Sequence, residues 1–459
     1  EVVFYSGLLA AVSFDIARRI VGPIIPLLGF LFLIYSFAPV AQMAPGLFEH
    51  QGFGLARVME FLMLEADGMT GLIVEVFATY VVIFVIIGAF LEKTGLGALF
   101  IDTTYRLTGQ RTGGPGLASV TSSGLFGMIS GRGVANVVTT GTFTIPMMKK
   151  TGFKAEIAAG IETAASTGGQ VMPPIMGASA FLIVEFTGIS YWEVVKVSIL
   201  PCALYFLSVY NIVHLEARKG GLVGLPADQL EQTWQVLKEG WYYLLPPFII
   251  IIALMYGYGV PFSGLIGILS IIILAALKGM LTLFQKSRSD GIGASDIYGS
   301  IGRGISNIIG ALESGAIRSL PICAAVGAVG LVMGTLFQTG LGIKFSTMMI
   351  SLAGDNLFLA IVLVGVASFV LGMGLPTSAA YIVLSVMAVP ALLEIGAPWS
   401  LSLLGAHLIV FWFSLDSSFT PPVCVPAYTA AGIADADPSK AAWAAFRTAK
   451  GMYVIPVMF

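Results

Sequence analysis

Four interruptions divide the apolar stretches of this chain, and they form two matching pairs. One pair is rich in glycine: the sequence is S-G-R-G at Ser130–Gly133 and G-M-G-L-P-T-S at Gly372–Ser378. The other pair consists of Pro173-Pro174 and Pro421-Pro422. Because proline removes a backbone donor and clashes with the preceding helical turn, each proline pair predicts two half-helices with an unwound joint. Each glycine-rich interruption predicts two short helices that meet at a tip.

The sequence around these interruptions is that of a membrane protein. Hydrophobic residues make up 57% and charged residues 10% of the 459 residues, and the mean hydropathy is +0.93. This is more apolar surface than one water-soluble core can bury, so the predicted fold class is an all-α polytopic membrane protein. Stretches of roughly 20 apolar residues, the length that crosses a bilayer, are predicted at 20–43, 70–91, 155–187, 191–213, 241–257, 262–277, 313–334 and 398–434.

Two further apolar stretches contain the glycine-rich tips, at 115–150 and 355–396. A break near the centre of each stretch predicts a re-entrant helical hairpin, which enters and leaves the membrane on one side. Segments that mix charged and apolar positions predict amphipathic helices along the bilayer surface. These segments are 50–66, 95–108, 227–239 and 292–311.

The interruptions occur in pairs because the chain contains a repeat. The string T-G-L-G occurs at Thr94–Gly97 and again at Thr339–Gly342, and a glycine-rich tip and a proline pair follow each copy at nearly constant separation. An odd number of predicted spans lies between the copies, so the second copy should be inverted relative to the first. Inverted repeats with paired broken helices are typical of secondary transporters, which bind substrate at the repeat interface.

The basic residues predict the orientation of these spans. Most of the 23 Lys and Arg fall on one side, including Arg18, Lys149 and Arg218, whereas Arg57 and Lys344 fall on the other. Basic residues concentrate on the cytoplasmic side of membrane proteins. We therefore expect the first hairpin to enter from the cytoplasm and the second from the opposite side.

The four interruptions are expected to meet near the middle of the bilayer and to form a binding site. Half-helix N-termini present N–H groups to an anion, and C-terminal ends present carbonyl oxygens to a cation. The candidates for substrate binding are Ser130, Gly131, Arg132, Gly133, Asn136, Gly374, Thr377 and Ser378. The candidates for the coupling ion are Gly168, Gln170, Gly372, Asp416, Ser417 and Thr420. The alternative is that these small residues only let the helices pack closely.

Arg132 is the charged residue at the first tip. Our hypothesis is that it binds a substrate carboxylate, because the guanidinium matches a carboxylate with two parallel hydrogen bonds. The alternatives are that Arg132 extends to water, or that it pairs with Glu162 or Asp416.

Acidic residues within or beside the predicted spans are candidates for ion coupling. They are Glu75, Glu162, Glu185 and Asp416. Asp416 is the strongest candidate because it lies directly before the second proline pair, where a buried carboxyl could carry a proton. His407 lies upstream on the same half-helix, and we expect it to be a hydrogen-bonded structural residue.

Other classes of function have little support in the sequence. There is no G-x-S-x-G or H-E-x-x-H motif and no P-loop, and the three histidines lie far apart. The net charge of −2 without a basic run gives no sign of nucleic-acid binding. The three cysteines lack a C-x-x-C spacing, and we expect free thiols, with no bound metal or cofactor. A channel whose filter is built from the re-entrant loops stays open as an alternative to a carrier.

Longer strings around the interruptions resemble a known family. They are S-G-R-G-V-A-N-V-V-T-T-G-T-F-T-I-P from Ser130, E-T-A-A-S-T-G-G-Q-V-M-P-P from Glu162, G-M-G-L-P-T-S-A-A-Y from Gly372 and T-P-P-V-C from Thr420. Together they resemble the large membrane subunit of tripartite ATP-independent periplasmic (TRAP) transporters, and within these the TAXI group, over residues 14–459. One departure is that Arg132 and Gly133 stand where the family tip usually has serines.

The resemblance implies an elevator-type secondary carrier in the bacterial cytoplasmic (inner) membrane, with both hairpins and both broken helices in a mobile domain. It implies a small carboxylate substrate, a soluble extracytoplasmic binding protein and a Na⁺ or H⁺ gradient. Na⁺ would then bind at the hairpin tips, although the missing serines remove two hydroxyls from the first. It also implies a small membrane subunit, fused or separate, and contact with membrane lipid.

The same resemblance divides the chain into six parts. Both ends look cut, because the chain starts without Met and stops in an apolar segment. The expected parts are the end of a preceding membrane segment (1–19), scaffold helices with a surface arm helix (20–93), a first transport half (94–190), scaffold helices with a second arm helix (191–334), a second transport half (335–440) and the start of a further membrane segment (441–459).

Overall fold

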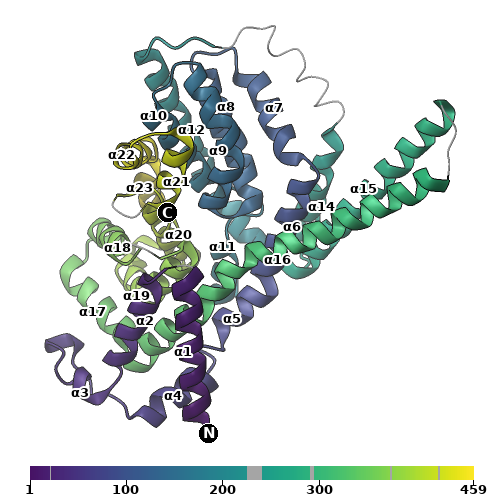
Figure 1. Cartoon of the computed structure of the whole chain (residues 1–459). Coiled ribbons are helices and arrows are strands. Elements are labelled where there is room, and N and C mark those ends of the chain that lie inside the picture. The colour runs from purple at the N-terminus through teal and green to yellow at the C-terminus, as the bar shows by residue number, and fades with distance from the viewer. Residues whose placement is uncertain (21, 225–239, 290–293, 373–374, 422–423) are drawn as a thin grey trace.

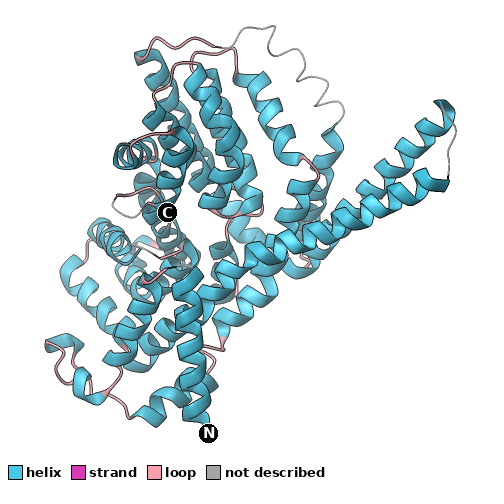
Figure 2. Ribbon diagram, in the orientation of Figure 1, coloured by secondary structure: helices cyan, strands magenta, loops and turns pink. Residues whose placement is uncertain are grey.

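The computed structural model describes residues 1–20, 22–224, 240–289, 294–372, 375–421 and 424–459. Within these ranges the chain forms helices and loops without a strand (Figure 2), which confirms the all-α prediction. The predicted surface helix at 227–239 and the candidate Gly374 lie outside the described residues.

Several helices in the described part are suited to a bilayer by length and composition. Five are long and apolar enough to cross a membrane: Leu72–Lys93, Tyr191–Lys219, Val260–Leu281, Ile297–Thr339 and Thr377–Trp399. Shorter apolar helices include Ile24–Tyr35, Ala178–Thr187, Leu341–Ala353, Leu357–Gly372 and Leu403–Ser418. The prediction of a chain with several membrane passes is therefore confirmed.

The two copies of the repeat contain the same helices in the same order. The first copy consists of α7 (Leu96–Thr108), α8 (Gly114–Ser130), α9 (Gly133–Lys150), α10 (Ala155–Gly168) and α11 (Ala178–Thr187). The second consists of α17 (Leu341–Ala353), α18 (Leu357–Gly372), α19 (Thr377–Gly396), α20 (Leu403–Ser414) and α21 (Val425–Ala434). We call α8–α9 hairpin 1 and α18–α19 hairpin 2. In Figure 1 hairpin 1 lies in the upper half of the molecule and hairpin 2 in the lower half, as expected for an inverted repeat.

Both predicted broken helices are present. Joint 1, residues 169–177, contains the short 3₁₀ turn η3 (Gly169–Val171) between α10 and α11. Joint 2, residues 415–424, contains η7 (Asp416–Ser418) between α20 and α21. The turn η3 ends two residues before Pro173 and η7 ends three residues before Pro421, so each helix is interrupted ahead of its proline pair.

A set of long helices surrounds the two repeats. It comprises α1 (Val2–Ile20), α2 (Ile24–Tyr35), α5 (Leu72–Val76) continuing through η2 (Phe77–Val81) into α6 (Val82–Lys93), α12 (Tyr191–Lys219), α14 (Leu245–Met255), α15 (Val260–Ser289) and α16 (Ala294–Thr339). Among these, α16 packs against α1, α2 and α6. The predicted surface helices at 50–66 and 95–108 correspond to α4 (Leu55–Leu64) and α7.

One predicted surface helix is wrong. Residues 292–311 were expected to form a separate amphipathic helix, but 294–311 are the first part of α16, which continues unbroken for 46 residues. This part pairs with α15 in the arm at the right of Figure 1. Its charged residues suggested a boundary, but the helical pattern runs through them. The predicted span at 20–43 is also shorter than expected, since α2 has only 12 residues.

Near the C-terminus, α22 (Pro438–Thr448) packs against α10 through small residues. A Cβ atom added at Gly160 of α10 would lie 2.7 Å from the Cβ of Ala444 and 2.7 Å from the backbone nitrogen of Ala445. Part of the predicted final segment, 441–459, therefore packs on the first copy of the repeat. The short α23 (Gly451–Val454) and η8 (Ile455–Met458) follow.

Gly160→Val is expected to destabilise the protein, because the added atoms must push α22 away from α10. Overpacking of this kind typically costs about 1–3 kcal/mol, which would appear as a lower melting temperature in detergent. Gly432→Ala on α21 is the matched control, because nothing lies within 4 Å of a Cβ there. Equal melting temperatures for both variants would contradict the tight packing of α10 on α22.

Candidate functional site

All four interruptions line one cavity of about 390 Å³. Hairpin 1 contributes residues 131–134, hairpin 2 contributes residues 372, 375–379 and 382, and the two joints with the helices after them contribute residues 170, 178–179, 417–418 and 425–426. The candidates that line the cavity are Gly131, Arg132, Gly133, Gln170, Gly372, Thr377, Ser378 and Ser417. The structure therefore brings together segments that lie far apart in the sequence.

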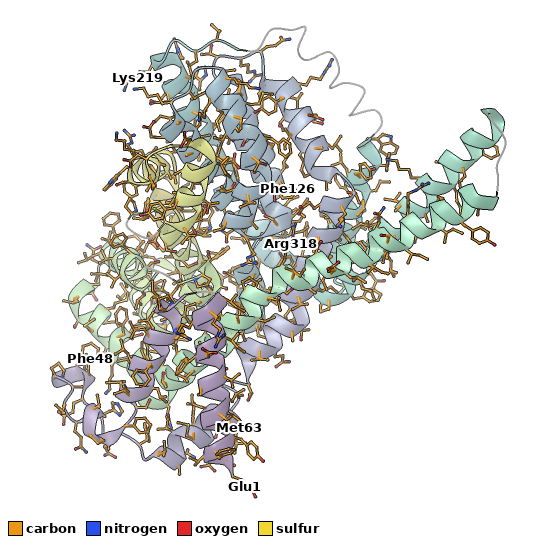
Figure 3. All side chains as sticks on the ribbon, viewed as in Figure 1. Glu1, Phe48, Met63, Phe126, Lys219 and Arg318 are labelled. Atoms are coloured by element: carbon orange, nitrogen blue, oxygen red, sulfur yellow. The ribbon has the colours of Figure 1, made fainter. Side chains whose placement is uncertain are left out.

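The opposite wall of the cavity comes from the surrounding helices. It consists of Ile20 at the end of α1, Phe77 in η2, and Pro321, Ile322, Ala325, Val326 and Val329 of α16. We did not predict this wall, because apolar residues on a long helix resemble ordinary core residues. Pro321, a proline inside an apolar helix, is the sequence feature that could have pointed to this wall. The cavity lies near mid-height of the molecule. Figure 3 shows this for the nearby Arg318, which lies between Lys219 towards one end and Phe48 and Met63 towards the other.

Four helices begin at this cavity, namely α9, α11, α19 and α21, and residues of the first turn of each line it. Among the described residues, none of these four N-termini has a side chain that caps its first N–H groups. Helices elsewhere, such as α4, α7, α10 and α17, also lack a side-chain cap, whereas Ser190, Ser402 and Asp437 cap α12, α20 and α22. Uncapped N–H groups and the partial positive charge of a helix N-terminus favour an anion.

Each hairpin tip touches the joint of its own repeat. A Cβ atom added at Gly133 would lie 3.2 Å from Thr167 Oγ1 and 3.3 Å from Gln170 Nε2. A Cβ atom added at Gly372 would lie 3.1 Å from the Cβ of Ser417. Glycine at these two positions lets the tip approach the joint closely, which holds both segments at the cavity.

Two oxygen atoms beside these contacts lack hydrogen-bond partners. Thr167 Oγ1 and Asp416 Oδ2 are buried, and neither has a partner among the described residues. The other carboxyl oxygen of Asp416 accepts a hydrogen bond from Ser368 Oγ at 3.4 Å. Since buried polar atoms are normally satisfied, these oxygens mark places where a bound ion or proton would fit.

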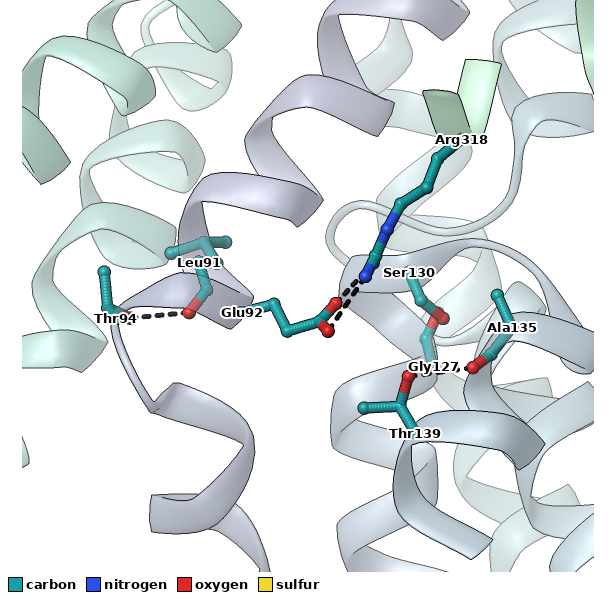
Figure 4. A network of polar contacts seen from close by, with 8 residues as sticks. All are labelled: Leu91, Glu92, Thr94, Gly127, Ser130, Ala135, Thr139 and Arg318. Atoms are coloured by element: carbon teal, nitrogen blue, oxygen red, sulfur yellow. Dashed lines mark hydrogen bonds and ion pairs between the residues drawn. The ribbon is translucent and has the colours of Figure 1, made fainter. Parts of the chain in front are cut away.

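Arg132 lines the cavity and also holds hairpin 1 against α16. Its Nη1 donates a hydrogen bond to the carbonyl oxygen of Arg318 at 2.8 Å, which is the only hydrogen bond of its guanidinium among the described residues. Arg318 in turn forms a two-pronged ion pair with Glu92 of α6, with Nη2 and Oε1 2.9 Å apart, close to Ser130 at the end of α8 (Figure 4).

The predicted alternative partners of Arg132 are wrong. Glu162 is fully buried and accepts hydrogen bonds from hydroxyls only, and Asp416 is bonded to Ser368. Both carboxyl groups lie behind the helix faces that line the cavity, where the guanidinium does not reach. His407 is hydrogen-bonded through Nδ1 to the hydroxyl of Tyr381 at 2.7 Å, which agrees with its expected structural role.

Other candidates lie behind the cavity wall. Asn136 is fully buried and donates from Nδ2 to the carbonyl oxygen of Ser123 at 2.7 Å. Gly168 packs against the ring of Tyr205. Ser130, Thr420 and Asp416 are not part of the lining either, although Asp416 lies directly behind Gly372, 3.5 Å from the position of an added Cβ.

A family model decides the identity of the chain. The model of the tripartite ATP-independent periplasmic transporter, DctM component, matches residues 8–457. The chain belongs to the TRAP transporter DctM family. It is therefore a multi-pass protein of the inner membrane, in a family of transporters and not of enzymes.

Characterised relatives share this family. The chain is 24% identical to the isethionate TRAP transporter permease protein DctMQ of Oleidesulfovibrio alaskensis over 77% of this chain and 52% of that protein. It is 25% identical to the C4-dicarboxylate TRAP transporter large permease protein DctM of Pseudomonas aeruginosa over 43% of this chain and 48% of that protein. The chain thus spans about half the length of the curated relatives it matches.

A solved structure shares the fold. The crystal structure of the YdaH transporter of Alcanivorax borkumensis matches with a TM-score of 0.55 at 14% identity. The match covers 94% of this chain and 96% of that one. At this identity the likeness concerns the arrangement of helices alone.

Proposed function

We propose that this protein takes up a small carboxylate by secondary active transport, driven by a Na⁺ or H⁺ gradient. The observation that carries this proposal is the meeting of four uncapped helix N-termini with Arg132 at one cavity. Both features favour an anion, and among the described residues Arg132 makes one of the five hydrogen bonds that a guanidinium can donate. A carboxylate would accept from the remaining N–H groups.

The coupling ion binds at the oxygen-rich contacts between tips and joints. Asp416 Oδ2 and Thr167 Oγ1, one in each repeat, are buried without a partner in the described part of the chain, and each lies beside a hairpin tip. A proton on Asp416, or Na⁺ held by its carboxylate and neighbouring carbonyls, would satisfy the first of them. Binding there would also fix the tip at the edge of the cavity, which links ion binding to substrate binding.

We further propose an elevator motion of the two repeats against the surrounding helices. The cavity has one wall from the repeats and one from α1, η2 and α16, so movement between these two bodies would open and close it. Ile20, in the wall formed by α1, η2 and α16, directly follows the basic pair Arg18 and Arg19. The distribution of basic residues assigns this pair to the cytoplasmic side. This supports a cavity directed towards the cytoplasm in the present structure.

The proposed partners are an extracytoplasmic binding protein and a small membrane subunit. Relatives are named for C4-dicarboxylate, isethionate and sialic acid, and DctMQ is named as one permease protein. The strings that resemble the TAXI group favour a fused small subunit here. Selection among small carboxylates would then lie largely with the binding protein.

Uptake by the full-length protein in proteoliposomes tests this function. Radiolabelled small carboxylates are supplied with the cognate binding protein, and Na⁺ and H⁺ gradients are imposed separately. We expect accumulation that saturates with substrate, needs the binding protein and follows one of the two gradients. Flux that neither saturates nor needs the binding protein would contradict a carrier and favour a channel.

A further inference from the structure

The most unusual polar site outside the cavity surrounds Glu162 in hairpin 1 and the adjoining α10. The Glu162 side chain is 0% exposed, and hydroxyl groups from three helices donate hydrogen bonds to its carboxyl oxygens. Ser119 reaches it at 2.7 Å, Ser123 at 2.8 Å, Thr140 and Thr144 at 2.6 Å each, and Ser166 at 3.0 Å. We call these five residues the hydroxyl cage.

No basic side chain in the described ranges pairs with this carboxyl group. None of the ion pairs found among the described residues involves Glu162. A buried carboxylate is costly unless it is paired or hydrogen-bonded, and here the hydroxyl cage supplies the hydrogen bonds. The hydroxyl oxygens lie at hydrogen-bonding distance from the carboxyl oxygens, so a metal ion between them would force the helices apart. A proton needs no such space.

The hydroxyl cage can satisfy both protonation states. When Glu162 is ionised, the hydroxyls donate to it. When it is protonated, its O–H needs an acceptor, and hydroxyls that turn away must find other acceptors. These exist: Thr140 lies 2.9 Å from the carbonyl oxygen of Asn136, Thr144 lies 3.1 Å from that of Thr140, and Ser123 lies 3.0 Å from Thr140 Oγ1. Rotation of hydroxyls is enough, without movement of the backbone.

A row of polar side chains leads from the hydroxyl cage to the cavity. On α10 and η3, Ser166 and Gln170 follow Glu162 at intervals of four residues, so all three lie on one helix face. Gln170 lines the cavity, about 12 Å along the helix axis from Glu162. Asn136 lies on the neighbouring helix α9. Its Oδ1 accepts a hydrogen bond from Thr140 Oγ1 at 3.3 Å.

The other titratable groups on neighbouring helices do not neutralise Glu162. Tyr105 of α7 is buried near it, and its hydroxyl has no hydrogen-bond partner in the described part of the chain. Tyr205 of α12 donates to the carbonyl oxygen of Ala164 at 2.8 Å, and Lys149 of α9 donates to that of Ala434. The basic residues of α22, Lys440 and Arg447, point to the exposed side, and α8 contains no titratable residue.

From this arrangement we propose that Glu162 is a proton-binding site in the transport half of the molecule. It rests on the proposed carrier function, and it adds a proton site separate from Asp416. The carboxylate takes up a proton from water that reaches the cavity, forming one O–H bond, and releases it when the cavity faces the other side. The hydroxyl cage holds the group in place in both states.

Infrared difference spectra of the purified full-length protein, recorded between alkaline and acid buffer, test this site directly. We expect a protonated-carboxyl band that appears on acidification and is lost in Glu162→Gln. It should remain in Glu394→Gln, the control at an exposed glutamate of α19. Thr144→Val keeps the carboxyl group and removes one donor to the ionised form, so the midpoint of the band should shift to higher pH.

Uptake in proteoliposomes separates this site from the proposed function. We expect Glu162→Gln to reduce the response of uptake to an imposed pH gradient by about tenfold or more, because binding of the driving ion is lost. An identical band and an identical pH response in Glu162→Gln would overturn the proton site while leaving the carrier intact. A Glu162 band in a protein that shows no uptake would instead overturn the carrier function.

Discussion

Arg132→Gln is expected to raise the apparent KM for the transported carboxylate by tenfold or more. Arg132 lines the cavity among four helix N-termini, and in the structure as described its guanidinium donates one hydrogen bond, to the carbonyl oxygen of Arg318. A hydrogen bond to a charged group contributes about 1.5–3 kcal/mol, and each 1.4 kcal/mol is about a tenfold change in affinity. Glutamine keeps one N–H donor group but loses the charge and the planar fork, so affinity should fall. Saturation curves of uptake in proteoliposomes measure the effect.

Arg132 also contacts α16 through the carbonyl oxygen of Arg318. Transport kinetics can separate this contact from binding of the carboxylate. If Arg132 only tethers hairpin 1 to the carbonyl oxygen of Arg318, its loss would change kcat and leave KM as it was. Arg111→Gln is the control, because that side chain is exposed and far from the cavity lining. An unchanged KM in Arg132→Gln would refute the carboxylate contact. Arg132→Lys should give an intermediate KM, because it restores the charge without the fork.

Asp416→Asn is expected to abolish gradient-driven accumulation while substrate exchange continues. The carboxyl group is 1% exposed, and its Oδ2 has no partner in the described structure. Asparagine keeps the shape and the bond to Ser368, but it can neither take up a proton nor balance the charge of Na⁺. The helix N-termini that would bind substrate are unchanged. Accumulation under an ion gradient and counterflow at equal ion concentrations, measured on the same vesicles, distinguish the two activities.

Asp435→Asn provides the matched control for this experiment. Asp435 is an exposed residue at the C-terminal end of α21, in a left-handed conformation with φ of 53°, which asparagine tolerates well. We expect this variant to accumulate substrate like the unaltered protein. Accumulation at the normal level in Asp416→Asn would exclude this carboxyl group from the coupling of ion and substrate.

The sequence was sufficient to predict those parts of the fold that depend on backbone chemistry. Proline pairs and glycine-rich tips stop helices for local reasons, so both hairpins and both joints could be located before the structure was known. Their recurrence after T-G-L-G predicted that the tips would meet. Residues 131–133 and 377–378 do line the same cavity.

The missed features depend on which way a side chain faces. Asn136 lies one turn from a tip, but its position on α9 turns it towards Ser123 and away from the cavity. The carbonyl oxygen that Arg132 contacts, at Arg318, belongs to the surrounding helices, and no local pattern marks a backbone acceptor. The hydroxyl cage was missed because its serines and threonines are spread over three helices and look like ordinary small packing residues.

The length of α16 has a mechanical consequence. Its 46 residues measure about 69 Å at 1.5 Å per residue, more than twice the roughly 30 Å of hydrocarbon in a bilayer. It must therefore lean strongly or emerge from the membrane, and its outer part lies in the arm with α15. Because the same helix carries Pro321–Val329 of the cavity wall, a partner that binds the outer part of α16 would also constrain the position of this wall.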